Sequence, residues 1–180
     1  GIDVRQYYGM TETTMMTHAT RPEDPKKDNI GVLVPNVEAK LVDVNGNGRL
    51  HTVATAAAHA SDTEVAEGET GELFVRSPGI MKGYLNNSQA TSDCVDQDGF
   101  LHTGDVACID GEGRFYIVDR IKELIKYKGF QVAPAELEEL LLLHPDVQDA
   151  AAVAVPADAS EDEILVAVTA RPGRTIDPAE

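Results

Sequence analysis

The sequence predicts a mixed fold, in which a β-rich body is followed by a small α+β unit. Strand patterns with turn residues recur about every ten positions between residues 37 and 118, a spacing typical of a small barrel or sandwich. A helix pattern then begins at Pro134, and two further strand patterns follow it. The length of 180 residues allows one compact domain, or one domain and part of another.

The composition is that of an ordinary globular protein, with 42% hydrophobic and 26% charged residues. With 31 acidic and 15 basic residues, the net charge is −16, which disfavours a general nucleic-acid binder and a polybasic membrane-surface module. No apolar run approaches the roughly 20 residues of a membrane helix. The two cysteines, Cys94 and Cys108, fit a reducing compartment without a disulfide framework or a CxxC metal site.

The first part of the β-rich body begins with a short apolar stretch, a polar turn at Tyr8–Thr13 and a charged loop over residues 21–30. Residues 37–44 alternate with period two and predict a strand. Asn45–Gly48 requires positive φ and predicts a turn. Residues 49–70 lack clear periodicity, and we expect an irregular surface insertion there.

Three more strands are predicted at Glu72–Arg76, Phe100–Ile109 and Arg114–Val118, the last two joined as a hairpin by Asp110–Gly113. Beyond them, Pro134 suits the first position of a helix, because the N–H that proline lacks would be unpaired there anyway.

In that helix, Leu137, Leu140 and Leu141 fall on one face, and His144-Pro145 ends it. Strand patterns at Val147–Val155 and Ile164–Ala170 complete the small α+β unit.

The run Tyr8–Glu12 combines residues suited to a magnesium nucleotide. Gly9 allows the backbone to approach a ligand closely, and Tyr8 offers a flat face to a base. Thr11 offers a hydroxyl to a phosphate oxygen, and Glu12 offers the hard carboxylate that Mg²⁺ prefers. A simple turn after a strand, with an ordinary aromatic residue, is the competing interpretation.

The run His102–Asp105 places a glycine inside a predicted strand. Such a glycine often marks the close approach of a ligand or of another backbone. The Asp105 carboxylate can accept two hydrogen bonds from a diol such as the ribose hydroxyls. The alternative is a bulge with an exposed aspartate, and we expect His102 to be structural.

The run Asp119–Gln131 has four basic and two acidic residues, so it is locally cationic in an acidic chain. A local cationic patch suggests an anionic partner. Alternation would place Lys122, Leu124 and Lys126 on one face of a strand. A solvated charged strand is the competing interpretation.

In this order, and with the stretch from Gly71 to Leu85, the three runs resemble the adenylate-forming superfamily of acyl-CoA synthetases, firefly luciferase and peptide-synthetase adenylation domains. The amino-acid sequence from Asp119 to Glu138 is most similar to that of 4-coumarate–CoA ligases. The resemblance implies that residues 1–119 form the C-terminal part of a large AMP-binding domain, with a β-rich subdomain from about residue 30 to 118. Residues 120–180 would begin a small α+β C-terminal domain.

Such enzymes activate a carboxylic acid with Mg-ATP to an acyl-adenylate and pass the acyl group to CoA, so the resemblance implies ATP, Mg²⁺ and CoA as cofactors. Charge stabilisation, more than covalent catalysis, carries this chemistry. The implied catalytic residues are Thr11 at the α-phosphate, Glu12 at the metal, and Lys126. The implied nucleotide-binding residues are Gln6, Tyr8, Gly9, Met10, Thr11, Asp105, Arg120, Lys122, Lys126 and Gln131. Among these, Asp105 would grip the ribose with help from Arg120, and Lys122 would sit at a hinge between the domains.

The resemblance also implies a loop on the CoA side at Lys128, Gly129 and Phe130. The acyl pocket would be lined by Tyr7, Gly9, Met15 and Met16. Because phenylpropanoid ligases resemble one another in having a small residue at the position of Tyr7, we expect a preferred acid other than 4-coumarate.

Two other functions fit the same motifs: a luciferase-like oxygenase or carrier-protein adenylation domain, and a non-catalytic nucleotide-binding module. The family's phosphate loop would lie upstream of these residues and its late catalytic lysine after residue 180. We therefore expect no adenylation activity from residues 1–180 alone. The expected partners are a small carboxylic acid, ATP and CoA, without nucleic acid or a membrane span, and the expected compartment is cytoplasmic or peroxisomal.

Overall fold

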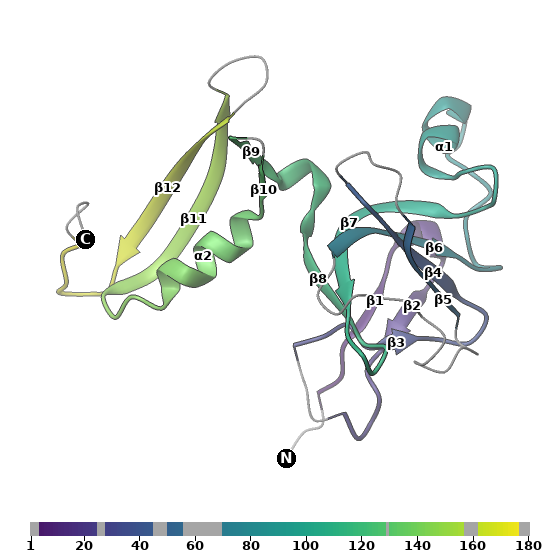
Figure 1. The fold of residues 1–180 in the computed structure, drawn as a ribbon, viewed down its shortest axis with the longest axis horizontal. Helices are drawn as coiled ribbons and strands as arrows, with labels where there is room; N and C mark the ends of the chain where they lie inside the picture. The colour runs from purple at the N-terminus through teal and green to yellow at the C-terminus, as the bar shows by residue number, and fades with distance from the viewer. Residues whose placement is uncertain are drawn as a thin grey trace. The chain divides into compact units, whose positions relative to one another are not determined.

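The computed structural model describes residues 4–24, 28–44, 50–55, 70–128, 130–156 and 162–176. The chain divides into two compact units, unit 1 (Gly1–Val118) and unit 2 (Asp119–Glu180). Strands predominate over helices in the described parts of both units (Figure 1). The mixed, strand-rich fold class is therefore confirmed.

Unit 1 is built around a five-stranded sheet in the order β5-β4-β6-β7-β8. The pairs β4–β5, β4–β6 and β6–β7 are antiparallel. The predicted strands and the β7–β8 hairpin are confirmed, since β7 and β8 lie side by side in the sheet. The strands span β4 (Glu38–Val42), β5 (Leu50–Thr55), β6 (Thr70–Arg76), β7 (Leu101–Ile109) and β8 (Phe115–Arg120).

One prediction for this sheet is wrong. Residues 50–55 belong to strand β5 and not to an irregular insertion, and they pair with β4 in the register Ala39↔Ala54 and Lys40↔Val53. Main-chain hydrogen bonds to the free edge of β4 hold this strand, so it needs no hydrophobic alternation of its own. The predicted turn at Asn45–Gly48 and the remainder of the expected insertion, residues 56–69, lie outside the described residues.

A second, three-stranded sheet carries the first motif. It consists of β1 (Tyr7–Gly9), β2 (Met16–Ala19) and β3 (Val32–Leu33), with a short 3₁₀ turn, η1 (Thr11–Thr13), between β1 and β2. Two backbone hydrogen bonds of 2.9 Å, from Ile30 N–H to the Phe115 carbonyl and from Phe115 N–H to the Gly31 carbonyl, join this region to β8.

The helix α1 (Ser88–Cys94) was not predicted. The Asn87 side chain caps it by accepting the Ala90 N–H at 3.0 Å, and this local capping pattern was the available sequence signal.

The core of unit 1 lies on one face of the large sheet and includes Leu41, Leu73, Val75, Leu101 and Phe115. Tyr8 and Met10 pack against this core. A closely packed core holds the side chains that touch it in fixed rotamers. The core therefore positions the predicted nucleotide motif.

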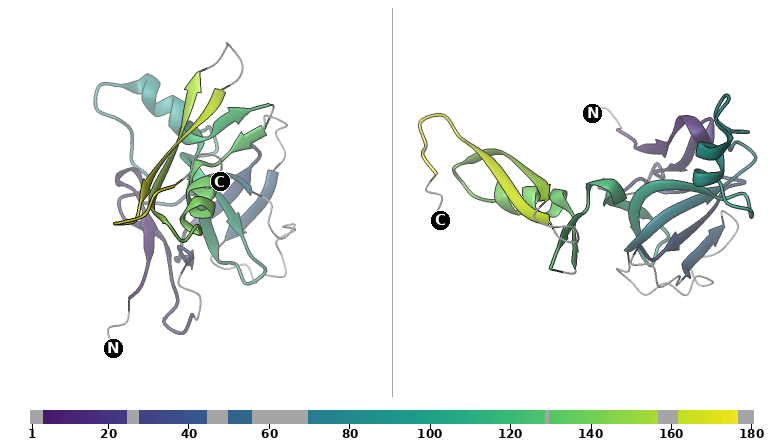
Figure 2. Two further views of the ribbon diagram at one scale, coloured as in Figure 1. Left: turned by 90° about the vertical axis from the view of Figure 1, so that its left-hand side faces the viewer. Right: turned by 90° about the horizontal axis from the view of Figure 1, so that it is seen from above.

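Unit 2 begins with a 3₁₀ turn, η3 (Ile121–Glu123), and a short hairpin of β9 (Ile125–Tyr127) and β10 (Phe130–Val132). The helix α2 (Pro134–Leu142) lies along β11 (Val147–Pro156), which pairs with β12 (Asp162–Ala170) (Figures 1 and 2). Proline at the first helical position, the helix and both long strands are confirmed.

One prediction for unit 2 is wrong. The η3 turn interrupts the expected strand over Asp119–Gln131, so Lys122 does not share a strand face with Lys126. The predicted leucine face of α2 is unevenly covered: Leu140 is 65% exposed, whereas Leu137 and Leu141 are partly buried. Among the described elements, α2 makes its most extensive contacts with β11.

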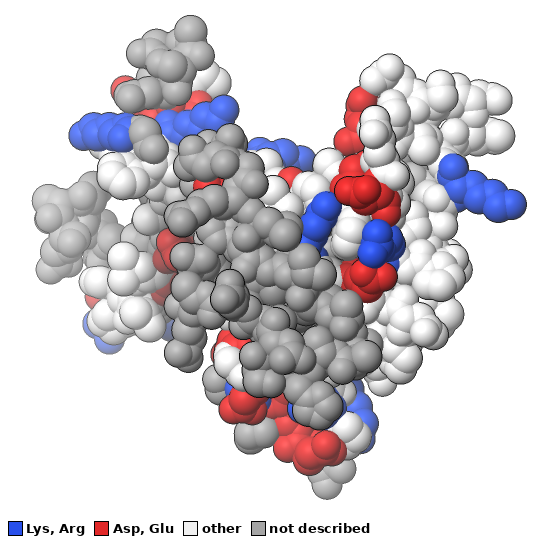
Figure 3. Space-filling model, turned by 45° about the vertical axis from the view of Figure 1, so that its right-hand side comes forward, with Lys and Arg blue, Asp and Glu red and all other residues white. Residues whose placement is uncertain are grey.

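The surface carries charges of both signs. On the face drawn in Figure 3, acidic and basic side chains lie next to one another over much of the charged area. Within the described residues, none of the helices has the length and apolar character needed to cross a membrane. Both cysteines have free thiols.

Candidate functional site

The structure joins the first two motifs within unit 1. The Tyr8 hydroxyl on β1 donates a hydrogen bond of 2.6 Å to Asp105 Oδ2 on β7, across 97 positions of sequence. Asp105 is only 4% exposed, so the alternative of an exposed aspartate is wrong. The residue suited to stack on a base and the residue suited to bind a diol therefore lie in contact.

A buried histidine supports Tyr8 from the neighbouring strand. His18 lies opposite Tyr8 in the β1–β2 register, with 5.5 Å between the ring centroids, and its ring also meets that of Phe115, with 4.5 Å between centroids. His18 Nδ1 lies 2.9 Å from Thr17 Oγ1. Burial lowers the pKa of His18 to about 3, so the imidazole is neutral near pH 7. Sequence analysis missed this residue because its role depends on long-range packing.

The turn after β1 is fixed by Gly9 and Thr13. A Cβ on Gly9 would lie 2.3 Å from the Met15 carbonyl oxygen, so the close approach that this glycine permits is to the chain's own backbone. Thr13, which was not predicted, is buried, and its Oγ1 accepts the Met10 N–H at 3.0 Å. The same hydroxyl oxygen lies 2.8 Å from the Met10 carbonyl oxygen and 2.6 Å from that of Met15.

Glu12 is tied to the segment that follows β6. The Tyr84 hydroxyl donates to Glu12 Oε1 at 2.7 Å, and the Met81 N–H donates to the Glu12 carbonyl at 2.7 Å. The bond to the carboxylate raises the pKa of Tyr84 to about 12, so the phenol remains a donor. Tyr84 was not among the predicted site residues, because only the fold brings it to Glu12.

The donor set at Glu12 fits a magnesium ion shared with phosphates. In the described part of the chain, no three or more His, Cys, Asp or Glu side chains are grouped to hold a metal ion by themselves. Protein sites usually hold Mg²⁺ through one or two carboxylates together with substrate phosphates and water. A single half-buried carboxylate beside a threonine hydroxyl matches that chemistry.

The predicted acyl-pocket side chains lie near this turn and are exposed in unit 1. Tyr7 precedes Tyr8 on β1 and so points to the opposite face of the strand. Met15 and Met16 also expose much of their side chains, and Met16 pairs with Gly9. Thr11 is exposed as well, and Gln6 is held through its backbone, whose N–H donates to Thr20 Oγ1 at 3.1 Å.

His102, in the second motif, has the contacts of a structural residue. Its ring stacks on Phe74 with 3.8 Å between centroids, and burial lowers the pKa of its imidazole.

In unit 2, the fold brings together two further predicted residues. Lys126 on β9 and Gln131 on β10 are directly paired in the hairpin register, so their side chains share one face. Both are exposed. Of the predicted CoA-side loop, Lys128 lies with its Nζ 4.9 Å from the Tyr127 ring centroid, Phe130 is 71% exposed, and Gly129 lies outside the described residues.

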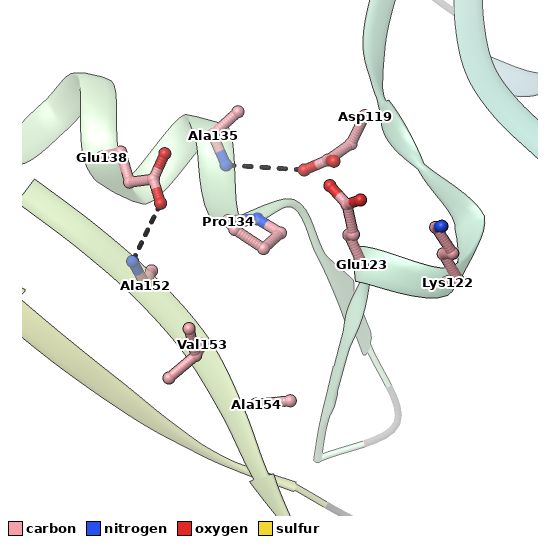
Figure 4. A pocket seen from close by; sticks show the side chains of 9 residues that line it. All are labelled: Asp119, Lys122, Glu123, Pro134, Ala135, Glu138, Ala152, Val153 and Ala154. Carbon is pink, nitrogen blue, oxygen red and sulfur yellow. Dashed lines mark hydrogen bonds between the residues drawn. The ribbon is translucent and has the colours of Figure 1, made fainter.

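A pocket of about 430 Å³ lies within unit 2, between η3, α2 and β11 (Figure 4). Lys122 lines it together with the carboxylates of Asp119, Glu123 and Glu138. Glu138 Oε1 accepts the Ala152 N–H at 2.9 Å and so ties the helix to the strand. The predicted hinge residue Lys122 thus borders a pocket, and Arg120 lies exposed two residues before it.

Three comparisons relate this geometry to known proteins. The family described as AMP-binding enzyme matches residues 1–85. The chain is 46% identical to 4-coumarate–CoA ligase-like 9 of Oryza sativa subsp. japonica, over 95% of this chain and 29% of that protein. It is 42% identical to luciferin 4-monooxygenase of Photinus pyralis, over 98% of this chain and 30% of that protein.

Among solved structures, ATP-bound MatB from Rhodopseudomonas palustris superposes with a TM-score of 0.81 and 30% identity, over 98% of this chain and 32% of that one. The chain thus spans 29% to 32% of the length of these proteins. The sequence matches and the strand-rich fold point to the same family. The chain belongs to the adenylate-forming superfamily of AMP-binding enzymes, which includes 4-coumarate–CoA ligases and luciferases.

Proposed function

We propose that the complete protein is an AMP-forming carboxylate–CoA ligase. It joins a carboxylic acid to ATP, releases pyrophosphate, and passes the acyl group from the acyl-adenylate to the thiol of CoA. The observation that carries this proposal is the hydrogen bond from Tyr8 to the buried Asp105, which unites the expected base-binding and ribose-binding residues. The similarity to a 4-coumarate–CoA ligase-like protein supports CoA as the acceptor.

In the first half-reaction, a substrate carboxylate oxygen attacks the α-phosphorus and pyrophosphate leaves. Asp105 holds the ribose hydroxyls, and the ring of Tyr8 stacks on the adenine. The exposed Thr11 hydroxyl donates to an α-phosphate oxygen, on which negative charge accumulates. Magnesium held at Glu12 would neutralise charge on the phosphates. The site thus acts by positioning and electrostatics.

In the second half-reaction, the CoA thiol attacks the acyl carbonyl and AMP leaves. We assign the Lys126–Gln131 face to the nucleotide in the first half-reaction and the loop at Lys128–Phe130 to the thiol side in the second. A turn of unit 2 about Lys122 would exchange the two faces. The position of η3 directly after the boundary between the units supports this hinge.

A luciferase-like oxygenase is the second candidate, because the chain is 42% identical to a luciferin 4-monooxygenase. Both candidates share the adenylate step and differ in the acceptor. An ATP–pyrophosphate exchange panel of acids with the complete protein identifies the acid, and turnover is then measured with CoA or with oxygen. CoA-dependent loss of the acyl-adenylate supports the ligase, and oxygen-dependent turnover contradicts it. AMP binding without acid-dependent exchange would indicate a non-catalytic module.

In this proposal, the large side chain of Tyr7 limits which carboxylic acids fit the acyl pocket. We expect the Tyr7→Gly variant to gain exchange activity with cinnamates relative to the parent, because removal of the ring enlarges the acyl pocket. Tyr7→Phe, which keeps the ring, is the matched control and should retain the parent's preference. An unchanged preference in Tyr7→Gly would remove Tyr7 from the acyl pocket.

A further inference from the structure

A bulge in β7 includes Asp105. The β6–β7 register runs from Thr70↔Cys108 to Glu72↔Val106 and resumes only at Phe74↔His102. Three residues of β7, 103 to 105, therefore lie opposite Leu73 alone. Bulges of this kind redirect a side chain out of the regular strand pattern and occur next to active sites.

Three hydrogen bonds hold this bulge. The Gly104 N–H donates to Glu72 Oε1 at 3.2 Å, the Thr103 hydroxyl donates to the Leu73 carbonyl at 2.6 Å, and the Asp105 N–H donates to Thr103 Oγ1 at 3.1 Å. Gly104 has φ +74°, a conformation that favours glycine, and nothing lies within 4 Å of where its Cβ would be. These bonds therefore hold Gly104 in a glycine-favouring conformation, with open space where a side chain would be.

Glu72 contributes a carboxylate to the hydrogen bonds that hold the bulge, through its contact with the Gly104 N–H. Burial raises the pKa of the Glu72 carboxyl, the nearby Asp105 carboxylate raises it further, and the bond from Gly104 opposes both effects. Placing a half-buried carboxylate beside another carboxylate is unfavourable. The hydrogen bond from the Gly104 N–H to the Glu72 carboxylate offsets part of this unfavourable free energy.

We propose that Glu72 is a positioning residue for nucleotide recognition, which holds the β7 bulge so that Asp105 meets Tyr8 and the ribose hydroxyls. The inference rests on the proposed function, because it assigns Asp105 to the ribose. Glu72 acts through the backbone of Gly104 and does not touch the nucleotide. The distinguishing consequence is selective: loss of Glu72 impairs recognition of the ribose hydroxyls more than binding of the rest of the nucleotide.

The test compares Glu72→Ala and Glu72→Gln in the complete protein by calorimetric binding of AMP and 2′-deoxy-AMP. We expect the parent to prefer AMP by roughly ten-fold or more, the effect of a hydrogen bond to a charged group. In Glu72→Ala the preference should fall to roughly two-fold, because the bulge relaxes. Glu72→Gln keeps an oxygen acceptor for Gly104 and should stay within roughly three-fold of the parent's preference. Glu38→Ala, which removes a sheet carboxylate paired with Arg76 instead, is the matched control.

Amide hydrogen exchange at Gly104, measured without nucleotide, gives a second readout. It should be on the order of ten-fold faster in Glu72→Ala than in the parent and unchanged in Glu38→Ala. An unchanged exchange rate or an unchanged AMP preference in Glu72→Ala would overturn the proposal. Equal losses in Glu72→Gln and Glu72→Ala would also overturn it, because the carboxylate would then act by charge. A parent that binds no AMP would refute the proposed function, and this inference with it.

Discussion

Acidification should destabilise the protein through a single buried histidine. The pKa of His18 is lowered by burial to about 3, from an ordinary value of 6.5. Below about pH 6.5 the unfolded chain binds a proton at this residue, whereas the folded chain binds none until about pH 3. The stability that comes from burying the neutral ring is therefore fully present above pH 6.5. It is lost progressively as the pH falls from there towards 3.

The size of this effect follows from the difference in proton binding. Each pH unit inside the window costs about 1.4 kcal/mol for one proton. At about pH 5.5, one unit below the ordinary pKa, the expected loss relative to neutral pH is therefore about 1.4 kcal/mol. The Thr17 hydroxyl beside His18 Nδ1 does not reverse the sign, because it cannot supply the negative charge that an imidazolium would need.

The assay is denaturant unfolding of the parent and of His18→Gln at about pH 7.5 and 5.5. Glutamine does not titrate, and the carboxylates common to both proteins cancel in the comparison. The parent should lose about 1.4 kcal/mol more than the variant between the two pH values. Equal losses in parent and variant would refute the neutral, buried state of His18, whatever the cost of the substitution at neutral pH.

Three further predictions follow from the site and the hinge. Thr13→Val should destabilise unit 1 by about 2 kcal/mol in denaturant unfolding, because buried backbone groups lose their partner, and the exposed Thr14→Val should cost less. Equal costs would contradict the assigned bonds. Tyr84→Phe should lower the magnesium concentration needed for half-maximal pyrophosphate exchange and for nucleotide binding, because the phenol no longer competes for Glu12. A raised requirement would show that Tyr84 assists the metal. Lys122→Pro should slow thioester formation more than Lys122→Ala, because proline restricts the proposed hinge; equal overall rates would exclude that hinge.

The elements that were predicted correctly are those whose own residues form a recognisable pattern. The alternation over residues 37–44 predicted β4, and the turn at Asp110–Gly113 predicted the hairpin. Pro134 marked the start of α2. By contrast, β5 forms by pairing with the edge of β4, which its own sequence does not indicate. The η3 turn lies in a stretch whose alternating residues would also suit a continuous strand. Pairing partners and turn geometry override local preference in both cases.

In the candidate site, too, the residues with a local motif could be predicted, and the long-range contacts could not. Its motif residues could be selected from their chemistry and their order along the chain. The contact between Tyr8 and Asp105 could not be predicted, because it joins residues 97 positions apart. Support by His18 and Glu72 is likewise a property of packed strands. A glycine inside the strand at Gly104 was the one sequence signal that pointed to the bulge.

In the proposed function, a nucleotide binds where Tyr8 and Asp105 meet. A crystal structure of the complete protein with AMP tests it most directly. We predict that both ribose hydroxyls donate to the Asp105 carboxylate and that the adenine lies against the Tyr8 ring. An ordered AMP away from these two residues would rule out this nucleotide site.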